Sequence, residues 1–349
     1  MNRPIQTAII GYGKAAKIFH VPLLKSSVDF NVISVLQRTK SDAKKDFPEV
    51  KIVRDLKDLL KDDTIELVVI TTPNHNHFEQ AFEALSADKH VVVEKPFTVT
   101  SEEAEKLIRL AQSKKRVLTA FQNRRWDGDF LTIKKLINEK SVGQIVEFES
   151  AFNRFRNFLR DDAWKEKDLP GSGIMYDLAP HLVDQSVLLF GMPQKVFADI
   201  RAQRGGDADD WFEINFYYSG VKVKLKAGML VPEHSPRMIL RGDKGTYIKF
   251  GLDLQEQALA DGNMPEGENW GQEPEENWGT LYKELNGEIV SERVKTVAGN
   301  YPAFYKELAY SIRKKQTPPV LPDTAKNVIK LLELAKESHL YGRVVDVIQ

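Results

Sequence analysis

The amino-acid sequence predicts an α/β domain with a doubly wound parallel sheet, followed by an α+β domain with a large, mainly antiparallel open sheet. Short apolar runs alternate with helical patterns over the first 125 residues, which is typical of successive strand–helix–strand units. After Trp126 the pattern changes to strands in series, separated by turn-like segments. A length of 349 residues fits two domains of roughly 100–200 residues each. We therefore expect one domain over residues 1–125 and a second over residues 126–349, whose C-terminal helix packs back on the first.

The strands expected in the first domain are rich in Val and Ile and apolar at successive positions, as in strands buried on both faces. Helical segments lie between them, and the one over Thr100–Lys114 begins with a capping box, because Thr100 precedes Glu103 by three residues. Another helical segment covers Asn74–Ala87. The expected strands are Thr7–Ile10, Val32–Leu36, Lys51–Val53, Leu67–Thr71, His90–Val93 and Val117–Phe121.

The second domain is expected to begin with a helix over Asp129–Glu139 and to contain a second helix from about Met175 to Phe190. Gln255–Gly279 resembles a long irregular insertion, and two helices close the chain at Pro302–Lys314 and Asp323–Leu340, the latter with Asp323 as N-cap. Turn composition between the strands predicts antiparallel hairpins. The expected strands are Ile145–Asn153, Lys195–Arg204, Trp211–Tyr218, Val221–Leu230, Arg237–Leu240 and Thr246–Phe250.

Composition excludes several classes of function. Fifty Lys and Arg residues balance fifty Asp and Glu residues, so the chain lacks the positive excess with which proteins bind nucleic acid or anionic membranes. The absence of cysteine removes disulfides, thiolate nucleophiles and Cys-ligated metal sites. No segment approaches the ~18 consecutive apolar residues of a membrane span. We expect a soluble cytoplasmic protein whose chemistry uses other side chains or a cofactor.

A glycine motif follows the first expected strand. Gly11, Gly13 and Ala16 form the pattern G-x-G-x-x-A at the start of a helix. The glycines allow a tight turn and bring a pyrophosphate close to the backbone, and the small Ala16 lets helix and strand pack closely. The motif alone also occurs in purely structural turns, but its place at the first strand of an α/β domain predicts a dinucleotide-binding Rossmann domain.

The end of the second expected strand indicates which dinucleotide binds. An NAD site usually places an acidic residue about 20 residues after the glycines, whereas a cation there favours the 2′-phosphate of NADP. Here Arg38 and Thr39 follow the strand, and no carboxylate comes before Asp42. The sequence therefore predicts NADP(H) as the preferred cofactor and NAD(H) as the second choice. The alternative is that Arg38 is only a solvent-exposed residue of a surface loop.

Two further polar segments end expected parallel strands, where ligands of open α/β sheets bind. Thr71, Thr72, Pro73 and Asn74 end the fourth strand, and Glu94-Lys95-Pro96 ends the fifth. At the rim of an apolar sheet, partial desolvation would suit Lys95 to proton exchange or to polarising a hydroxyl group. The alternative is an ordinary surface ion pair of Lys95 with a carboxylate.

A third segment carries an acid and a histidine at helical spacing. Asp177 and His181 are four residues apart, hence on one face of a helix, and Asp184 follows one turn later. An acid–base pair and a metal-ligand pair would both use this spacing, and a structural histidine is the third interpretation. Pro180 within the pattern predicts a kink or a non-helical turn.

Taken together, these motifs resemble the Gfo/Idh/MocA family of NAD(P)-dependent oxidoreductases. Four longer segments most closely resemble its NADP-dependent scyllo-inositol dehydrogenase branch: Gly11–His20, Lys95–Thr100, Asn123–Leu131 and Gly171–Gln185. The resemblance covers essentially the whole chain and rests on Gly11-x-Gly13-x-x-Ala16, Thr72-Pro73-Asn74-x-x-His77, Glu94-Lys95-Pro96, Asn123-Arg124-Arg125 and Asp177-x-x-x-His181-x-x-Asp184. It implies that Lys95, Asp177 and His181 meet around the substrate beside the nicotinamide, with no catalytic metal. The cofactor contacts that it implies, with those of the glycine motif, are Gly11, Tyr12, Gly13, Lys14, Ala16, Arg38, Thr39, Thr71, Thr72, Pro73, Asn74, His77, Glu94, Lys95 and Asn123.

The resulting expectation is an NADP-preferring oxidoreductase that interconverts a secondary alcohol and the ketone of a polyol or sugar, scyllo-inositol being one candidate. His181 would be the acid/base, oriented by Asp177, and Lys95 would polarise the reacting oxygen, although the roles of His181 and Lys95 are exchangeable. The alternatives are reduction of another carbonyl, such as an anhydro-ketose or a tetrapyrrole-like substrate, a non-catalytic NADPH sensor, and a metal-binding module. The presence of Lys95, Asp177 and His181 argues against the sensor, because a sensor needs only the glycine loop and Arg38.

Two expectations concern the surface of the second domain. Arg154, Phe155 and Trp164 lie in a basic and aromatic loop suited to hydroxyl and ring-face contacts with a substrate, or they form ordinary surface. The long strands need a cover on one side, which predicts a homo-oligomer, dimer or tetramer, with sheets face to face. Lys222, Lys224 and Lys226, which alternate with apolar residues, would otherwise be a solvated face.

Overall fold

The computed structural model describes residues 3–160 and 163–348 and divides the chain into two compact units. Unit 1 contains the chain up to Asn123 together with Gln255–Trp270 and Asn300–Lys326. Unit 2 contains Arg124–Leu254, Gly271–Gly299 and the chain from Asn327 onward. Asp161 and Asp162, within the loop expected to bind substrate, lie outside the described residues.

Unit 1 is built on a six-stranded parallel sheet with the strand order β3-β2-β1-β4-β5-β6. This is the order of a dinucleotide-binding doubly wound sheet, so the predicted fold of the first domain is confirmed. The central strands are apolar throughout because helices cover both faces, and all four residues of β4 are buried. The strands are β1 (Ile5–Ile10), β2 (Phe30–Leu36), β3 (Lys51–Val53), β4 (Leu67–Ile70), β5 (His90–Glu94) and β6 (Leu118–Phe121).

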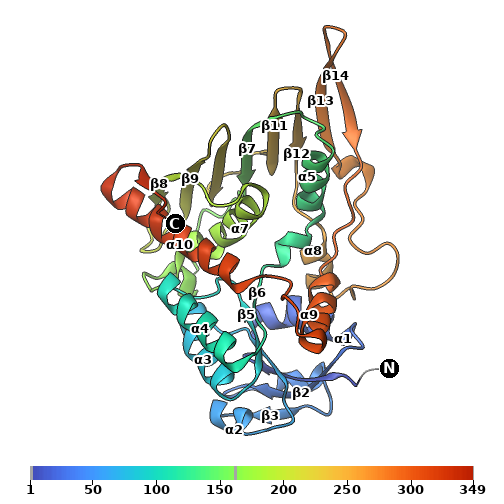
Figure 1. Cartoon of the computed structure of the whole chain (residues 1–349), viewed down its shortest axis with the longest axis vertical. Coiled ribbons are helices and arrows are strands. Elements are labelled where there is room, and N and C mark those ends of the chain that lie inside the picture. Colours follow the sequence, from blue (N-terminus) through green and yellow to red (C-terminus); the bar gives the residue numbers. More distant parts are fainter. Residues whose placement is uncertain (1–2, 161–162, 349) are drawn as a thin grey trace. The chain divides into compact units, whose positions relative to one another are not determined.

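The helices of unit 1 flank this sheet on both sides, with α3 and α4 packed together on one side and α1 and α9 on the other (Figure 1). The predicted capping box at the start of α4 is confirmed: the Glu103 backbone N–H donates to the Thr100 hydroxyl oxygen at 3.2 Å, and the Glu103 carboxylate accepts from the Thr100 N–H at 3.1 Å. The helical elements are the π-helix η1 (Ala16–His20), α1 (Val21–Lys25), α2 (Leu56–Leu60), α3 (His77–Ser86), α4 (Ser101–Lys114), α8 (Gln255–Ala260) and α9 (Pro302–Lys314).

Unit 2 is built on a nine-stranded sheet with the order β14-β13-β12-β11-β7-β10-β9-β8-β15. The neighbours pair antiparallel except β7 and β10, which run parallel, so the predicted mainly antiparallel sheet is confirmed. The strands are β7 (Ile145–Ala151), β8 (Lys195–Arg201), β9 (Trp211–Tyr217), β10 (Lys222–Gly228), β11 (Met238–Gly242), β12 (Gly245–Lys249), β13 (Gly279–Leu285), β14 (Glu288–Val294) and β15 (Val345–Asp346).

One face of this sheet is apolar and packs against helices of the same unit. Val223, Leu225 and Ala227 of β10 are fully buried, as their alternation with lysines predicts, and α7 contacts this strand. On the opposite face, Arg241 pairs with Glu147 at 2.8 Å and with Glu149 at 2.6 Å. The helices are α5 (Gly128–Asn138), α6 (Gly173–Asp177), α7 (Ala179–Phe190) and α10 (Pro322–Tyr341), which begins in unit 1.

Three parts of the second half differ from the sequence-based expectation. The segment Gln255–Gly279 contains the helix α8, and the hairpin of β13 and β14, which extends beyond the rest of the sheet in Figure 1, was not expected at all. The helix α10 begins at Pro322, so Asp323 lies in its first turn and is not its N-cap, because proline is favoured at the first helical position. None of the described helices is long and apolar enough to cross a bilayer.

Candidate active site

The glycine loop after β1 is shaped for a close approach of the backbone to a ligand. Gly11 has a φ of +86°, and a Cβ at this position would lie 3.0 Å from Cγ2 of Thr72. The Thr71 hydroxyl donates to the Ile10 and Gly11 carbonyls, each at 3.1 Å, and so fixes the turn. Gly13 is exposed, and a Cβ there would meet no atom within 4 Å. The loop therefore fits a pyrophosphate, because its conformation is held from inside and its outer side is open.

The other loop residues are divided between the interior and the surface. Tyr12 is buried, and its hydroxyl donates to the Asp46 carboxylate at 2.6 Å. Burial, with a further contribution from Asp46, raises the pKa of the Tyr12 hydroxyl. Ala16 is fully buried, as close packing of helix and strand requires, whereas Lys14 is exposed beside Gly13. Lys14 can thus contact a ligand on the open side of the loop.

Asp42, the first carboxylate that follows β2 in the chain, already has hydrogen-bond partners. Asp42 accepts hydrogen bonds from Lys17 and Gln37, each at 2.5 Å, and these bonds lower the pKa of Asp42 to about 2. Arg38 and Thr39 are exposed, and Arg38 forms no ion pair with any described residue. An exposed guanidinium without an ion pair, followed in the chain by a carboxylate that Lys17 and Gln37 already engage, fits a 2′-phosphate better than a ribose 2′-hydroxyl.

His77 links the loops that follow β4 and β5. It is buried; its Nδ1 lies 2.8 Å from the Pro96 carbonyl oxygen, and its Nε2 lies 2.9 Å from the Thr72 carbonyl oxygen. Burial lowers the pKa of the His77 imidazole. Both ring nitrogens face backbone carbonyl oxygens, and the neutral ring donates its one N–H to either Pro96 or Thr72. A cofactor would therefore meet the loops rather than this ring.

Glu94 and Lys95 at the end of β5 rest on a buried network. The Lys95 backbone N–H donates to Oε2 of Glu94 at 2.9 Å, and Oε1 of Glu94 lies 3.0 Å from Nε2 of His20. Nδ1 of His20 in turn lies 2.7 Å from the Tyr305 hydroxyl oxygen, and His20 is fully buried. Burial alone would raise the pKa of Glu94, but the contact with His20 lowers it below its usual value. His20 and Tyr305 were missed as functional residues because they contact Glu94 only in the folded chain.

The expected cofactor residues of unit 1 gather at one edge of its sheet. They follow the carboxyl ends of β1, β2, β4, β5 and β6, where parallel strands place their ligands. Asn74, which begins the short 3₁₀ helix η3 (Asn74–Asn76), and Asn123, after β6, are buried there, and Lys95 is half-buried.

In unit 2, the segment with Asp177 begins at a helix terminus that only glycine allows. Gly173 has a φ of +78°, and a Cβ there would lie 2.0 Å from Oδ2 of Asp209. The other oxygen, Oδ1 of Asp209, accepts the Met175 N–H at 2.7 Å at the start of α6. Burial raises the pKa of the Asp209 carboxyl to about 6. Asp209 was not expected to matter, because it lies 34 residues from Met175 in the chain.

Asp177 and His181 do not share one helix as the spacing predicted. Asp177 ends α6 and His181 lies in the first turn of α7, with Leu178 between the helices. The predicted effect of Pro180 is confirmed, because the helix is interrupted at Leu178 and Pro180 lies in the first turn of the second helix, where its missing N–H is tolerated. His181 is 4% exposed, and Asp177 accepts a hydrogen bond from Lys165 at 2.6 Å. Lys165 is a further polar group at this carboxylate that the motifs did not indicate.

Asp184 is occupied by a buried ion pair. Arg125 donates to its two oxygens at 2.7 Å and 2.6 Å, and although burial opposes the charge on Arg125, the contact with Asp184 raises the pKa of the guanidinium. This bidentate geometry fixes the start of unit 2 against α7. Among the described residues, no group of three or more His, Asp or Glu side chains is arranged to hold a metal ion.

The three residues expected to bind substrate differ in their surroundings. The Arg154 guanidinium lies 5.0 Å from the ring centroid of Phe152, on which Arg237 also stacks at 5.2 Å. Trp164 is half-buried beside Lys165, whose Nζ lies 5.8 Å from the indole. Phe155 is 58% exposed. Trp164 is therefore connected through Lys165 to Asp177, and Arg154 belongs to a cluster of arginines around Phe152.

Comparison with known proteins places both units in one family. The description "Oxidoreductase family, NAD-binding Rossmann fold" matches residues 5–122, and "Oxidoreductase family, C-terminal alpha/beta domain" matches residues 134–347. The chain is 38% identical over 342 residues to scyllo-inositol 2-dehydrogenase (NADP(+)) IolW of Bacillus subtilis, covering 98% of this chain and 95% of the relative. It is 42% identical over 339 residues to the uncharacterized oxidoreductase YdgJ of Escherichia coli, covering 97% of each.

Solved structures agree with this assignment. The structure of yvaA from Bacillus subtilis matches with a TM-score of 0.96 and 37% identity over 100% of both chains. An oxidoreductase from Bacillus cereus matches with a TM-score of 0.89 and 33% identity over 99% of both chains. The chain therefore belongs to the Gfo/Idh/MocA family of NAD(P)-dependent oxidoreductases.

Proposed function

We propose that this oxidoreductase prefers NADP(H) and interconverts a secondary alcohol and the ketone of a polyol or sugar, with scyllo-inositol as the first substrate to test. The observation that carries the proposal is the similarity over nearly the whole chain to a relative named scyllo-inositol 2-dehydrogenase (NADP(+)). The exposed Arg38, together with the engagement of Asp42 by Lys17 and Gln37, supports the cofactor preference.

In the proposed mechanism, a nicotinamide cofactor held at the glycine loop would supply the hydride acceptor for oxidation and the hydride donor for reduction. His181 takes the hydroxyl proton during oxidation and gives it back during reduction. Asp177 orients His181, and Lys165 holds the Asp177 carboxylate. Lys95 donates a hydrogen bond to the reacting oxygen and stabilises its partial negative charge. The roles of His181 and Lys95 are interchangeable, and a pH profile of each variant distinguishes them.

The glycine loop allows a test of cofactor binding that leaves the fold unchanged. Because a Cβ at Gly13 meets no atom within 4 Å, Gly13→Ala is expected to keep the unfolding temperature while it weakens NADPH binding at least tenfold. The measurement is a fluorescence titration with NADPH next to a thermal unfolding curve. Unchanged NADPH affinity would show that the dinucleotide does not approach this loop.

The cofactor preference has its own test at Arg38. A charge-assisted hydrogen bond to phosphate contributes about 1.5–3 kcal/mol, or roughly ten- to hundredfold in affinity. Arg38→Asp should therefore abolish or reverse the preference for NADP. Equal kcat/KM with NAD and NADP in the unmodified protein would contradict the proposal.

The substrate is tested with a panel of inositols, aldoses and ketoses, followed by the absorbance of the reduced nicotinamide. The proposal predicts turnover of at least one cyclic or linear polyol with NADP. Turnover of other carbonyl compounds alone would favour the alternative reductase. Tight NADPH binding without turnover of any compound would favour a sensor.

We also propose that the chain forms a homo-oligomer, dimer or tetramer, through the outer face of the nine-stranded sheet. This face mixes apolar and paired charged residues: Ile239 and Ile248 lie in one row with Lys224 and Glu149, which form an ion pair at 3.7 Å. All four side chains are only half-exposed. A monomeric mass by light scattering at micromolar concentration would contradict this proposal.

A further inference from the structure

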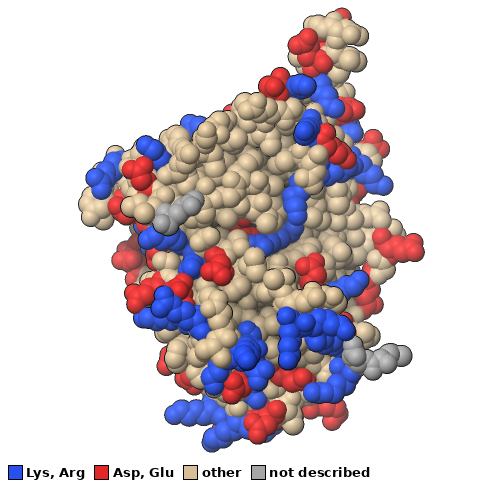
Figure 2. All heavy atoms as spheres, viewed as in Figure 1, with Lys and Arg blue, Asp and Glu red and all other residues tan. Residues whose placement is uncertain are grey.

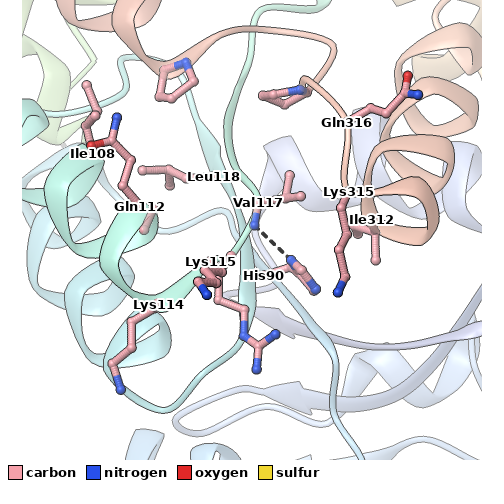
Figure 3. Close-up of a pocket in the computed structure, with 14 residues that line it drawn as sticks. His90, Ile108, Gln112, Lys114, Lys115, Val117, Leu118, Ile312, Lys315 and Gln316 are labelled. Carbon is pink, nitrogen blue, oxygen red and sulfur yellow. Dashed lines mark hydrogen bonds between the residues drawn. The ribbon is translucent and has the colours of Figure 1, made fainter.

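A cavity of about 660 Å³ opens in unit 1 at the amino ends of β5 and β6 (Figure 3). His90 begins β5, and Val117 and Leu118 lie at the start of β6. Because all strands of this sheet are parallel, the cavity lies at the edge opposite the carboxyl ends that carry the glycine loop. The volume is that of an ordinary small-molecule site. The cavity is therefore separate from the proposed cofactor site.

The residues that line the cavity include four cations, Lys114, Lys115, Arg116 and Lys315, and no Asp or Glu. Lys115, Arg116 and Lys315 form no ion pair with any described residue, whereas Lys114 lies 3.4 Å from Asp88. Nε of Arg116 is buried and has no hydrogen-bond partner among the described residues. In Figure 2, Lys and Arg side chains gather over the region of unit 1 between α4 and α9. The cavity thus presents uncompensated positive charge.

Helix termini explain only part of this charge. The C-terminal ends of α4 and α9 both reach the cavity, and cations near such ends are favourable. However, Lys115 and Lys315 follow the last helical residues with a φ of 52° each, where glycine is the preferred residue. Glycine would relieve the backbone at both positions, whereas the lysines bring two ammonium groups to the same cavity. Figure 3 shows Lys315 and His90 on the same side of the cavity, while Lys114 extends away from it.

The cavity also has a neutral donor and an apolar wall. Nδ1 of His90 accepts the Val117 N–H at 2.9 Å, so the proton of the neutral ring is on Nε2, which can donate. Burial, together with the charge of Arg116, lowers the pKa of His90 to about 4, so this ring is neutral near pH 7. The apolar part of the wall is formed by Ile108, Ala111, Leu118, Ile312, Pro318 and Pro322.

We propose that this cavity is a second binding site, for a small organic phosphate whose apolar or ring-shaped body rests on the apolar wall. Lys115, Arg116 and Lys315 bind the phosphate oxygens, and the dianionic charge of a phosphate monoester suits three unpaired cations better than a carboxylate does. Gln112 and Gln316 at the cavity provide further hydrogen bonds to such a ligand.

The test uses phenyl phosphate as the probe, with phenol and inorganic phosphate as comparison ligands, in isothermal titration calorimetry of the full chain. The proposal predicts saturable binding of phenyl phosphate that is at least tenfold tighter than binding of either comparison ligand. Binding must be unchanged in Arg38→Asp, because Arg38 and the glycine loop lie at the other edge of the sheet. Equal affinity for inorganic phosphate, or loss of phenyl phosphate binding in Arg38→Asp, would overturn the proposal.

The positive φ of Lys115 and Lys315 allows a variant that preserves the fold. Lys115→Gly combined with Lys315→Gly relieves the backbone at both positions, so the unfolding temperature should stay the same or rise. Binding of phenyl phosphate should weaken at least tenfold. The matched control is Lys114→Gln, which removes a neighbouring charge that pairs with Asp88 and should change affinity less than twofold. An equal loss in both variants, or no loss in the double variant, would exclude the cavity as the site.

Discussion

Two carboxylates, the buried Glu94 in unit 1 and the half-buried Asp209 in unit 2, support the two segments proposed to carry the chemistry. Glu94 accepts the backbone N–H of Lys95 at 2.9 Å, and Asp209 accepts that of Met175 at 2.7 Å, two residues before Asp177. Their pKa values nevertheless shift in opposite directions. Burial favours protonation of both, but contact with His20 lowers the pKa of Glu94, while Asp209, which forms no ion pair with a described residue, titrates near pH 6.

The difference shows that burial alone does not decide the charge of a carboxylate. A buried partner within hydrogen-bond distance can stabilise the ionised carboxylate more than the loss of solvent destabilises it. Without such a partner, the protonated, neutral form is favoured. Lys95 is therefore held by an ionised acid, whereas the start of α6 is held by an acid that takes up a proton in the mildly acidic range. Four predictions test this contrast.

The largest effect, a loss of kcat, is expected when Lys95 or His181 is replaced. General acid–base groups typically contribute ~10²–10⁴ in rate, so Lys95→Ala and His181→Ala should each lower kcat by that order while NADPH affinity stays within threefold or so. The kcat of both variants is measured with the polyol that proves to be a substrate. A near-normal kcat in either variant would remove that residue from the mechanism.

The second prediction concerns the partner of Glu94. His20→Leu leaves a buried carboxylate without its partner and should lower the free energy of unfolding at pH 7 by about 3–5 kcal/mol. The pKa of Glu94 should rise, so the loss should shrink as the pH falls below its value. Urea unfolding at pH 7 and pH 5 measures both effects. Tyr305→Phe, which removes only one hydroxyl, is the control and should lose about 1 kcal/mol. Equal losses in the two variants would show that Glu94 does not depend on His20.

The third prediction concerns the contact of Gly173 with Asp209. Gly173→Ala adds backbone strain and forces the Asp209 carboxylate away, since the Cβ would lie 2.0 Å from Oδ2. We expect a loss of about 2–4 kcal/mol in the free energy of unfolding, together with reduced activity. Gly191→Ala is the matched control, because its φ is +75° but no atom lies within 4 Å of the added Cβ, so only the strain remains. If both variants lose the same stability, the Asp209 contact contributes nothing.

The smallest effect is expected for the charge of Asp209 itself. Its folded pKa of about 6 lies above the ordinary value of 3.8, so its contribution to stability is complete below the ordinary value and is lost as the pH rises through 6. Asp209→Asn keeps an acceptor for the Met175 N–H and should be more stable than the native protein above pH 7 by about 1–3 kcal/mol, and equally stable near pH 4. Thermal unfolding from pH 4 to pH 8 measures this, and parallel profiles for the two proteins would contradict it.

Features with local causes were predictable from the sequence. The capping box of Thr100 and Glu103 joins residues three apart, and the apolar strands of unit 1 are buried on both faces, so both leave a pattern in the chain. The glycine motif likewise combines a turn and a helix start within six residues, Gly11 to Ala16.

Features that depend on distant contacts were not predictable in the same way. His20 and Glu94 are 74 residues apart, and no spacing rule connects them. Asp177 and His181 were expected on one helix because the helical period does not show the interruption at Leu178. The strand β14 lacks the alternation that marks a half-buried strand, because nearly all of its residues are exposed.

That exposed strand has a consequence for how the protein behaves at high concentration. β14 is the long free edge of the nine-stranded sheet, since the opposite edge, β15, has only two residues. A free edge with Ile289 74% exposed offers backbone groups and apolar surface to another chain. Glu288, Glu292 and Arg293 place charges along it, and charged side chains on an edge strand disfavour pairing with another chain. These charges thus protect the hairpin against aggregation by sheet extension. Replacing them with neutral residues should leave the fold intact but lower the solubility of the protein.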